Sequence, residues 1–511
     1  MTALEHPARR PGGPARPRDR VPFPVVDEVS RHCLQEEEPE TVHIEVHLPG
    51  TPDPDRLTAA FTEALRRHPR ILMREARGPW YRRRYEWELT DTPDTEVVTF
   101  PAPGPDALKR ARERALAEAP PLSTSPPIRL EVVAQPPPTG GRASEPRGRT
   151  GISARSTEAQ APSATTEAES QGWRGRTYRG GPAPQPEERT PAPAPGSVLL
   201  LTINHTALDG PACLRVLATA AELYGGRDNS PAAPPTRTPT SPGAPGATPE
   251  PPPDAPSGWT PPARVARGAP EPSPGNGMLV AELPVPRRPK GSPFTVNDQL
   301  MVATALMIAH WNHEHGARPR PFRITMPVDD RPRDATMPIG NGTRLVEVPF
   351  EAAELAMRDW TPEAIHDLLR RTSDRTRALK ALPRPQLGHG AALLTAPVLP
   401  VTLRAAVTRG LRRAAAPWTS TTLLSNIGRV PYALDFGDAG RAHAVWFSAP
   451  ARLPRGLTVT TASTAGRLHL ALRWSKTLLS HGDGAHLRDL FERYLHATEH
   501  TEPHRTHGEP T

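Results

Sequence analysis

The stretch TINHTALDG, residues 202–210, joins an apolar run to a helical pattern and carries a histidine followed four residues later by an acid. The preceding run GSVLLL, 196–201, is apolar enough for a central strand of a sheet. We expect this strand to end at His205, with Gly210 allowing the tight turn that brings Asp209 close. A neutral imidazole in such a place can take a proton from an attacking hydroxyl, amine or thiol. The stretch therefore predicts a reactive centre at a strand end.

A second interpretation of His205 stays open from these residues alone. Most histidines at strand ends are ordinary polar groups satisfied by hydrogen bonds. His205, however, closes a continuous apolar run, where a polar group has to be hydrogen bonded or used. Asp209 is expected either to orient the loop or to neutralise a nearby cation.

Length and composition indicate a large ordered framework with long insertions. The chain has 511 residues, enough for two to four domains or one two-lobed unit, yet only 36% are hydrophobic and 69 are proline. We expect disorder in the tails 1–20 and 501–511, in an insertion at 136–196 and in a linker at 229–276. The ordered parts are then an N-terminal lobe, 21–228, and a C-terminal lobe, 277–500.

Charge and cysteine usage narrow the class of protein. The formal net charge is +8, but part of it lies in the Pro-rich N-terminal tail and few aromatic residues accompany the basic ones, so we expect no nucleic-acid partner. Cys33 and Cys213 lack the spacing of a disulfide framework or a metal site. Neither a secretory signal nor an apolar run long enough for a membrane span is present, which predicts a cytoplasmic protein.

Periodicity predicts alternating strands and helices. Strand patterns occur at 41–48, 128–133, 198–205, 278–285, 321–328, 421–430 and 457–474. The first alternates strictly and predicts a half-buried strand. One helical pattern follows Asp53, a predicted N-cap, and a second runs from Gly210 to the glycines at 225 and 226. A third starts near a predicted cap at Asn297. Helical patterns also occur within 381–417, where prolines break them, and at 485–498.

HTALDG matches the HxxxDG motif, and other segments agree with it in the expected order: residues 54–71, 214–226, 294–311, MPVDDRP at 326–332, IGNGT at 339–343 and LLSNIGRV at 423–430. In these features the chain resembles the condensation-domain superfamily of CoA- and carrier-dependent acyltransferases. That superfamily includes chloramphenicol acetyltransferase, nonribosomal peptide condensation domains, polyketide-associated acyltransferases and BAHD enzymes.

The resemblance implies an α/β fold of two chloramphenicol-acetyltransferase-like sandwich lobes that form a V around a central channel. It also implies transfer of an acyl group from a CoA or carrier-protein thioester to an alcohol or amine, in specialised metabolism. His205 would be the general base, and Asp209 a structural residue paired with Arg331. A backbone N–H near Gly210 would bind the oxyanion.

Two asparagines have roles implied by the same resemblance. Asn426 would face the channel from the far lobe, although it could equally be a turn residue. Asn204 stands where many members have a first histidine, and its amide can supply one donor and one acceptor there.

No metal or redox cofactor is expected, because the acyl-CoA or phosphopantetheine-bound donor is a substrate. The expected partners are a small-molecule acceptor and the CoA or carrier-protein donor, bound by a monomer. Basic clusters at 82–84 and 404–413 are either solvated faces or docking sites for that donor. Two alternatives stay open: a catalytically inactive condensation-fold scaffold or carrier-binding partner, and cyclisation, dehydration or C–C bond formation on the same fold.

Overall fold

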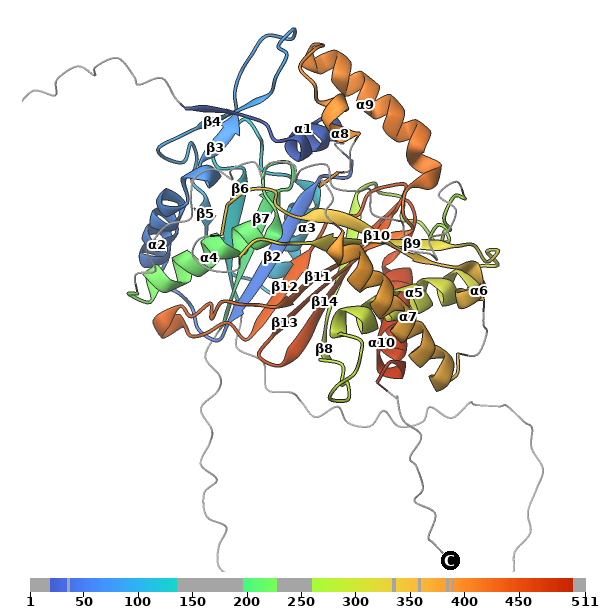
Figure 1. Ribbon diagram of the computed structural model, residues 1–511. Helices are drawn as coiled ribbons and strands as arrows, with labels where there is room; N and C mark the ends of the chain where they lie inside the picture. Colours follow the sequence, from blue (N-terminus) through green and yellow to red (C-terminus); the bar gives the residue numbers. More distant parts are fainter. Residues whose placement is uncertain are drawn as a thin grey trace, which may run out of the picture.

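The computed structural model describes residues 19–34, 37–135, 196–227, 260–332, 337–356, 360–382, 386–387 and 390–499. The predicted disordered stretches 1–18, 136–195, 229–259 and 501–511 lie outside the described residues. Within them the chain is a mixed α/β protein with three sheets (Figure 1). None of the described helices combines the length and the apolar character that a membrane crossing requires.

The first large sheet holds the strand that ends at the histidine. Its order is β12-β2-β7-β6-β5, made of Ala444–Ser448, Thr41–Leu48, Ser197–Asn204, Ile128–Ala134 and Val98–Thr99. All eight residues of β7 are buried, which confirms the predicted central strand. Its outermost strand β12 comes from the second half of the chain and pairs antiparallel with β2. The second half of the chain therefore contributes a strand to the first large sheet.

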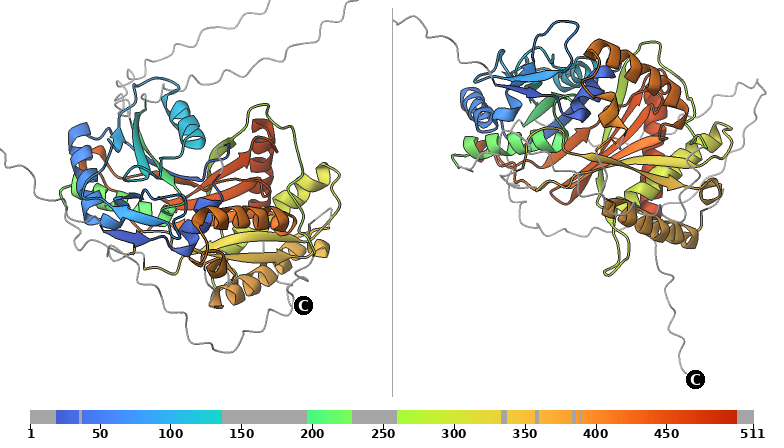
Figure 2. Two further views of the ribbon diagram at one scale, coloured as in Figure 1. Left: turned by 90° about the horizontal axis from the view of Figure 1, so that it is seen from above. Right: turned by 45° about the horizontal axis from the view of Figure 1, so that its top comes forward.

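Helices cover both faces of this sheet. On one face α2 (Pro54–Arg67) and α4 (Gly210–Tyr224) share a core with the apolar residues of β2 and β7, and on the other α3 (Ala107–Ala117) packs on Val133 and Leu200 (Figure 2). The predicted N-cap is confirmed, since the Asp53 carboxylate accepts from the Arg56 N–H at 2.8 Å. The predicted end of α4 at the glycines is also confirmed.

The second large sheet forms the other half. Its order is β10-β9-β11-β13-β14-β8, made of Arg344–Phe350, Phe322–Val328, Thr422–Arg429, Leu457–Thr464, Arg467–Ser475 and Asn276–Pro284. The short helix α6 (Ala352–Leu355) follows β10. Helices α5 (Val296–Glu314), α7 (Pro362–Ala381) and α10 (His481–Ala497) share one apolar core with this sheet.

A small third sheet and three helices lie along one edge of the molecule (Figure 1). The sheet has the order β1-β4-β3, with strands Arg20–Pro22, Glu86–Leu89 and Met73–Glu75. Helices α1 (Val25–His32), α8 (Ala391–Leu394) and α9 (Val401–Ala415) lie beside it, and single 3₁₀ turns occupy Pro69–Ile71, Ala416–Trp418 and Gly437–Ala439. The helices broken at prolines within 381–417 are thus confirmed as α8 and α9.

Three local expectations were wrong. Strand β2 is not half-buried, because α3 covers its polar face and Arg112 donates to the Glu45 carboxylate at 2.7 and 2.8 Å. Helix α5 is capped by Thr295 and not by Asn297, because Asp298 completes a capping box with Thr295.

The third is the predicted disordered linker at 229–276, in its described part. Residues 260–275 lie along the second half, where Ala263 and Val265 are buried in its core. The Ala263 N–H donates to the Pro321 carbonyl at 2.8 Å, so this extended segment packs as part of the second half.

Candidate active site

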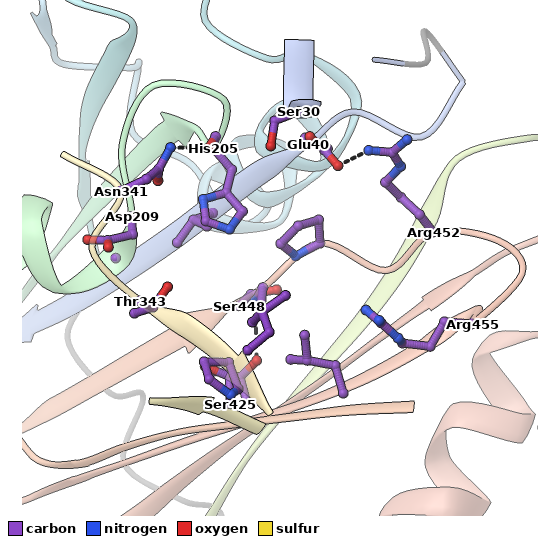
Figure 3. A pocket seen from close by; sticks show the side chains of 18 of the residues that line it. Ser30, Glu40, His205, Asp209, Asn341, Thr343, Ser425, Ser448, Arg452 and Arg455 are labelled. Carbon is purple, nitrogen blue, oxygen red and sulfur yellow. Dashed lines mark hydrogen bonds and ion pairs between the residues drawn. The ribbon is translucent and has the colours of Figure 1, made fainter. Parts of the chain in front are cut away.

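A cavity of about 310 Å³ lies where the end of β7 meets the second half of the chain. His205, Asp209 and Gly210 line it from the first half, and Asn426, Ser448 and Arg455 are among the residues that line it from the second. Figure 3 shows His205, Asp209 and Asn341 at one end and Arg452 and Arg455 at the other. The predicted reactive histidine therefore faces a space that both halves enclose.

His205 is held in one orientation by the turn that follows β7. Its Nδ1 lies 3.0 Å from the Leu208 carbonyl oxygen, and its backbone N–H donates to the Glu40 carbonyl at 2.8 Å. A carbonyl oxygen can only accept, so Nδ1 carries the proton in the neutral ring and the lone pair is on Nε2. This tautomer suits a base that takes a proton from a group in the cavity.

Asp209 is the N-cap of α4 and at the same time the partner of Arg331. Its Oδ1 accepts from the Ala212 N–H at 3.0 Å, and its Oδ2 accepts from Arg331 Nη2 at 2.7 Å and from the Gly342 N–H at 2.8 Å. The ion pair expected between Asp209 and Arg331 is therefore present, and both side chains are buried. Asp209 holds the turn and does not hydrogen bond to the His205 ring.

Arg331 is anchored by more than one carboxylate. Its Nε and Nη2 donate to Asp329 at 2.8 and 2.9 Å, and its Nη1 donates to the Gly340 carbonyl at 2.9 Å. Burial by itself would lower the pKa of Arg331, but Asp209 and Asp329 raise it above its usual value. The guanidinium is thus a permanently charged bridge between the loop of the first half and that of the second.

Asn341 ties the histidine turn to the buried carboxylate of Asp27. Its Nδ2 lies 3.2 Å from the His205 carbonyl, 3.0 Å from the Thr206 carbonyl and 2.9 Å from Asp27 Oδ1. Burial raises the pKa of Asp27 to about 6, against the opposing effect of Arg70. The sequence shows the IGNGT motif, but no pattern in it predicts the contacts of its asparagine.

The remaining predicted residues support the site from its edges. The buried Asn204 side chain donates to the Pro120 carbonyl at 2.9 Å and accepts from the Thr206 N–H at 3.1 Å, so it shapes the turn without lining the cavity. Asn426 does line it, and its Oδ1 accepts from the Gly428 N–H at 2.9 Å within a bulged part of β11. Asn426 therefore lies at the cavity wall and its side chain holds the β11 bulge, while its predicted place in a channel stays a prediction.

Gly210 is the first residue of α4, and its N–H is among the helix donors that have no partner within the helix. A Cβ there would lie 3.3 Å from the Phe447 ring, which also lines the cavity. The start of α4 therefore packs closely against Phe447, a residue of the cavity wall.

The opposite end of the cavity is rich in arginine, which the sequence analysis missed. Arg455 donates to Ser420 Oγ at 3.1 Å and to Thr325 Oγ1 at 3.4 Å, while Arg452 contacts the Glu40 carboxylate and the Cys33 carbonyl. Burial lowers the pKa of Arg455 to about 10, and neighbouring arginines add to this shift. This end suits an anionic group such as a carboxylate or phosphate. Arg452 and Arg455 occupy no recognisable motif, so only their position reveals them.

Comparison with family models found no match. Among curated proteins, the uncharacterized protein Rv2305 of Mycobacterium tuberculosis strain H37Rv is 25% identical over 443 residues, covering 81% of this chain and 84% of that protein. Its counterpart MT2362 in strain CDC 1551 matches with the same values.

Solved structures match over nearly the whole chain. Trichothecene 15-O-acetyltransferase from Fusarium sporotrichioides superimposes with a TM-score of 0.57 at 12% identity, covering 94% of this chain and 95% of that one. The condensation domain of monacolin K polyketide synthase MokA gives 0.53 at 12%, covering 94% and 97%. The starter condensation domain of rhizomide synthetase RzmA, a mutant solved with C8-CoA and Leu-SNAC, gives 0.54 at 13%, covering 94% of each chain. The chain therefore has the fold of condensation domains and chloramphenicol-acetyltransferase-like acyltransferases.

Proposed function

We propose that this protein is an acyltransferase that moves an acyl group from a CoA or carrier-protein thioester to an alcohol or amine. The single observation that carries the proposal is the geometry of His205. Its Nδ1 is tied to the Leu208 carbonyl at 3.0 Å and its ring lines a cavity shared by the two halves. The shared fold supports the reaction class, and one structural neighbour, a mutant starter condensation domain, was solved with C8-CoA and Leu-SNAC.

In the proposed reaction His205 Nε2 takes the proton of the acceptor hydroxyl or amine as its oxygen or nitrogen attacks the thioester carbonyl carbon. The new C–O or C–N bond forms and the carbonyl oxygen becomes an oxyanion. The N–H of Gly210, at the positive end of α4, is the proposed donor to that oxygen. The C–S bond then breaks, and the imidazolium returns the proton to the leaving thiolate.

Asp209 and Arg331 are proposed to position this machinery without touching the substrate. Their ion pair joins the turn that carries His205 to the part of the second half that holds Asp329 and Gly342, so it sets the distance between the two walls of the cavity. We further propose that the cavity is the midpoint of a channel between lobes set in a V, which donor and acceptor enter from opposite faces. The arginine end of the cavity would then bind an anionic part of one substrate.

The test is thioester turnover with acetyl-CoA, octanoyl-CoA and octanoyl carrier protein, with simple alcohols and amines as acceptors. Free thiol release and acceptor mass are followed for wild type, His205→Ala and His443→Ala, the last an exposed histidine outside the cavity. We expect acceptor-dependent transfer in wild type and His443→Ala and its loss in His205→Ala. Equal transfer by His205→Ala would refute the general-base role. A wild type that binds loaded carrier protein but transfers nothing would instead support the inactive scaffold.

A further inference from the structure

Exposed large apolar side chains gather around α9. The α9 surface is defined here as the tip of the β3–β4 loop together with residues 391–418, that is α8, the segment between α8 and α9, α9 itself and the 3₁₀ turn after it. These parts lie together at one edge of the molecule (Figure 1). It holds nine of the thirteen exposed large apolar residues in the described part of the chain: Trp80, Tyr81, Leu393, Val398, Leu399, Leu403, Val407, Leu411 and Trp418. Apolar residues clustered in this way mark an interaction surface.

Helix α9 has one face packed in the protein and a second apolar stripe in solvent. Val401, Arg404, Ala405 and Thr408 are buried, at the spacing of a single helix face. Leu403, Val407 and Leu411, spaced four residues apart, are 48%, 45% and 50% exposed. At 1.5 Å per residue this stripe runs about 12 Å along the helix. The packing of α9 within the protein therefore does not explain why this second stripe is apolar.

An aromatic pair extends the stripe and is held against the start of α9. Trp80 and Tyr81 are 75% and 61% exposed, and their rings meet edge to face at 5.8 Å. The Val401 N–H donates to the Arg82 carbonyl at 2.9 Å, and Arg404 Nη1 donates to the Arg83 carbonyl at 2.8 Å. The loop tip is thus braced so that two amphipathic rings point outward.

The charge of this surface has one sign. Residues 76–85 and 375–434 contain no aspartate or glutamate. Arg82 and Arg404 pair internally with Glu75 and Glu28. The exposed arginines that remain are Arg77, Arg83, Arg84, Arg409 and Arg413. Within the described residues none of them forms an ion pair, and Arg409 Nη1 donates to the His32 carbonyl at 3.5 Å. Apolar and aromatic side chains flanked by arginines that have no ion-pair partner among the described residues complement an anionic, partly apolar partner.

We propose that the α9 surface binds the interfacial region of an anionic membrane. Leucine, valine and tryptophan side chains enter the boundary between headgroups and acyl chains, and flanking arginines pair with lipid phosphates. A second copy of this chain fits poorly, because a symmetric contact would place arginines against arginines. Arg412 of α9 lines the cavity, so the membrane surface adjoins it. On the function proposed above, the bilayer would then supply a lipid-soluble substrate.

The test is co-sedimentation of the whole chain with vesicles of phosphatidylcholine containing 30% phosphatidylglycerol, compared with vesicles of phosphatidylcholine alone. We expect binding to the anionic vesicles that weakens as salt rises from 50 to 500 mM. Each arginine near an anionic surface contributes roughly fivefold to partitioning, so Arg409→Gln with Arg413→Gln should weaken binding roughly 25-fold. Trp80→Ser with Leu403→Ser should also weaken it.

Matched controls change the same residue types elsewhere. Phe100→Ser replaces an exposed aromatic outside the α9 surface, and Lys109→Gln with Arg110→Gln removes two exposed cations from α3. Neither should change partitioning, and circular dichroism should show that all variants fold. Absence of wild-type binding to anionic vesicles at 50 mM salt would overturn the proposal. So would an α9 variant that binds vesicles normally but loses binding to an acidic acyl carrier protein. These outcomes do not depend on acyl transfer.

Discussion

Replacing Asp209 with asparagine removes one charge from the interface between the two halves while keeping the side-chain shape. The carboxylate accepts hydrogen bonds on both oxygens, from the Ala212 N–H on Oδ1 and from Arg331 and the Gly342 N–H on Oδ2. An asparagine has one oxygen and one NH₂ group. In either orientation of the amide, its NH₂ group therefore faces another N–H donor in a buried site.

The expected loss in the free energy of unfolding is about 3 kcal/mol. Breaking a buried ion pair by removing one partner costs about 3–5 kcal/mol. The low end applies because Arg331 keeps both of its bonds to Asp329. An alanine at 209 would also remove the N-cap, at a further cost of about 1 kcal/mol.

Urea unfolding followed by far-UV circular dichroism measures this loss. The matched control is Asp367→Asn, whose carboxylate is 47% exposed in pairs with Arg370 and Arg371, so a change within about 0.5 kcal/mol is expected. In a double-mutant cycle with Arg331→Met, the coupling between positions 209 and 331 should be at least about 2 kcal/mol. An unfolding midpoint of Asp209→Asn equal to that of wild type, or a coupling near zero, would show that the buried ion pair does not stabilise the fold.

Three further predictions concern the same region. Gly342→Ala should destabilise the fold and lower transfer, because a Cβ at residue 342 would overlap the Arg331 guanidinium. If urea titration finds this variant as stable as wild type, the backbone at Gly342 can move aside. The pKa of Asp27 is about 6 in the folded chain against a reference value of 3.8, so its stabilising contribution is complete below pH 3.8 and is lost as pH rises through 6, a change of about 3 kcal/mol. In urea titrations, the free energy of unfolding should fall by about this amount more in wild type than in Asp27→Asn between pH 4 and pH 7. Arg455→Met removes a buried cation, so stability should stay within about 1 kcal/mol of wild type or rise, and a loss above 3 kcal/mol would contradict this.

Local sequence signals predicted those elements whose ends are set by neighbouring residues. The Asp53 cap, the apolar strand before His205 and the stop of α4 at the glycines depend on contacts within a few residues, and the structure confirms them. The Thr295 cap shows the limit of this reasoning, since two polar residues compete for one helix start and the partner Asp298 decides between them. The pairing of Asp209 with Arg331 came from a motif resemblance and not from any local period.

Local sequence patterns are enough to predict where His205 lies and which turn holds it, because an apolar strand followed by a capped helix is encoded within a few residues. The surroundings of His205 depend instead on contacts between distant parts of the chain. Strand β12 joins β2 across some 400 residues, Asn341 reaches the His205 turn, and Arg455 enters the cavity through contacts that no short repeat encodes. Short sequence patterns do not encode these positions, because the chain reaches them by burying two apolar cores and pairing its buried charges at the same time. That balance depends on the whole chain.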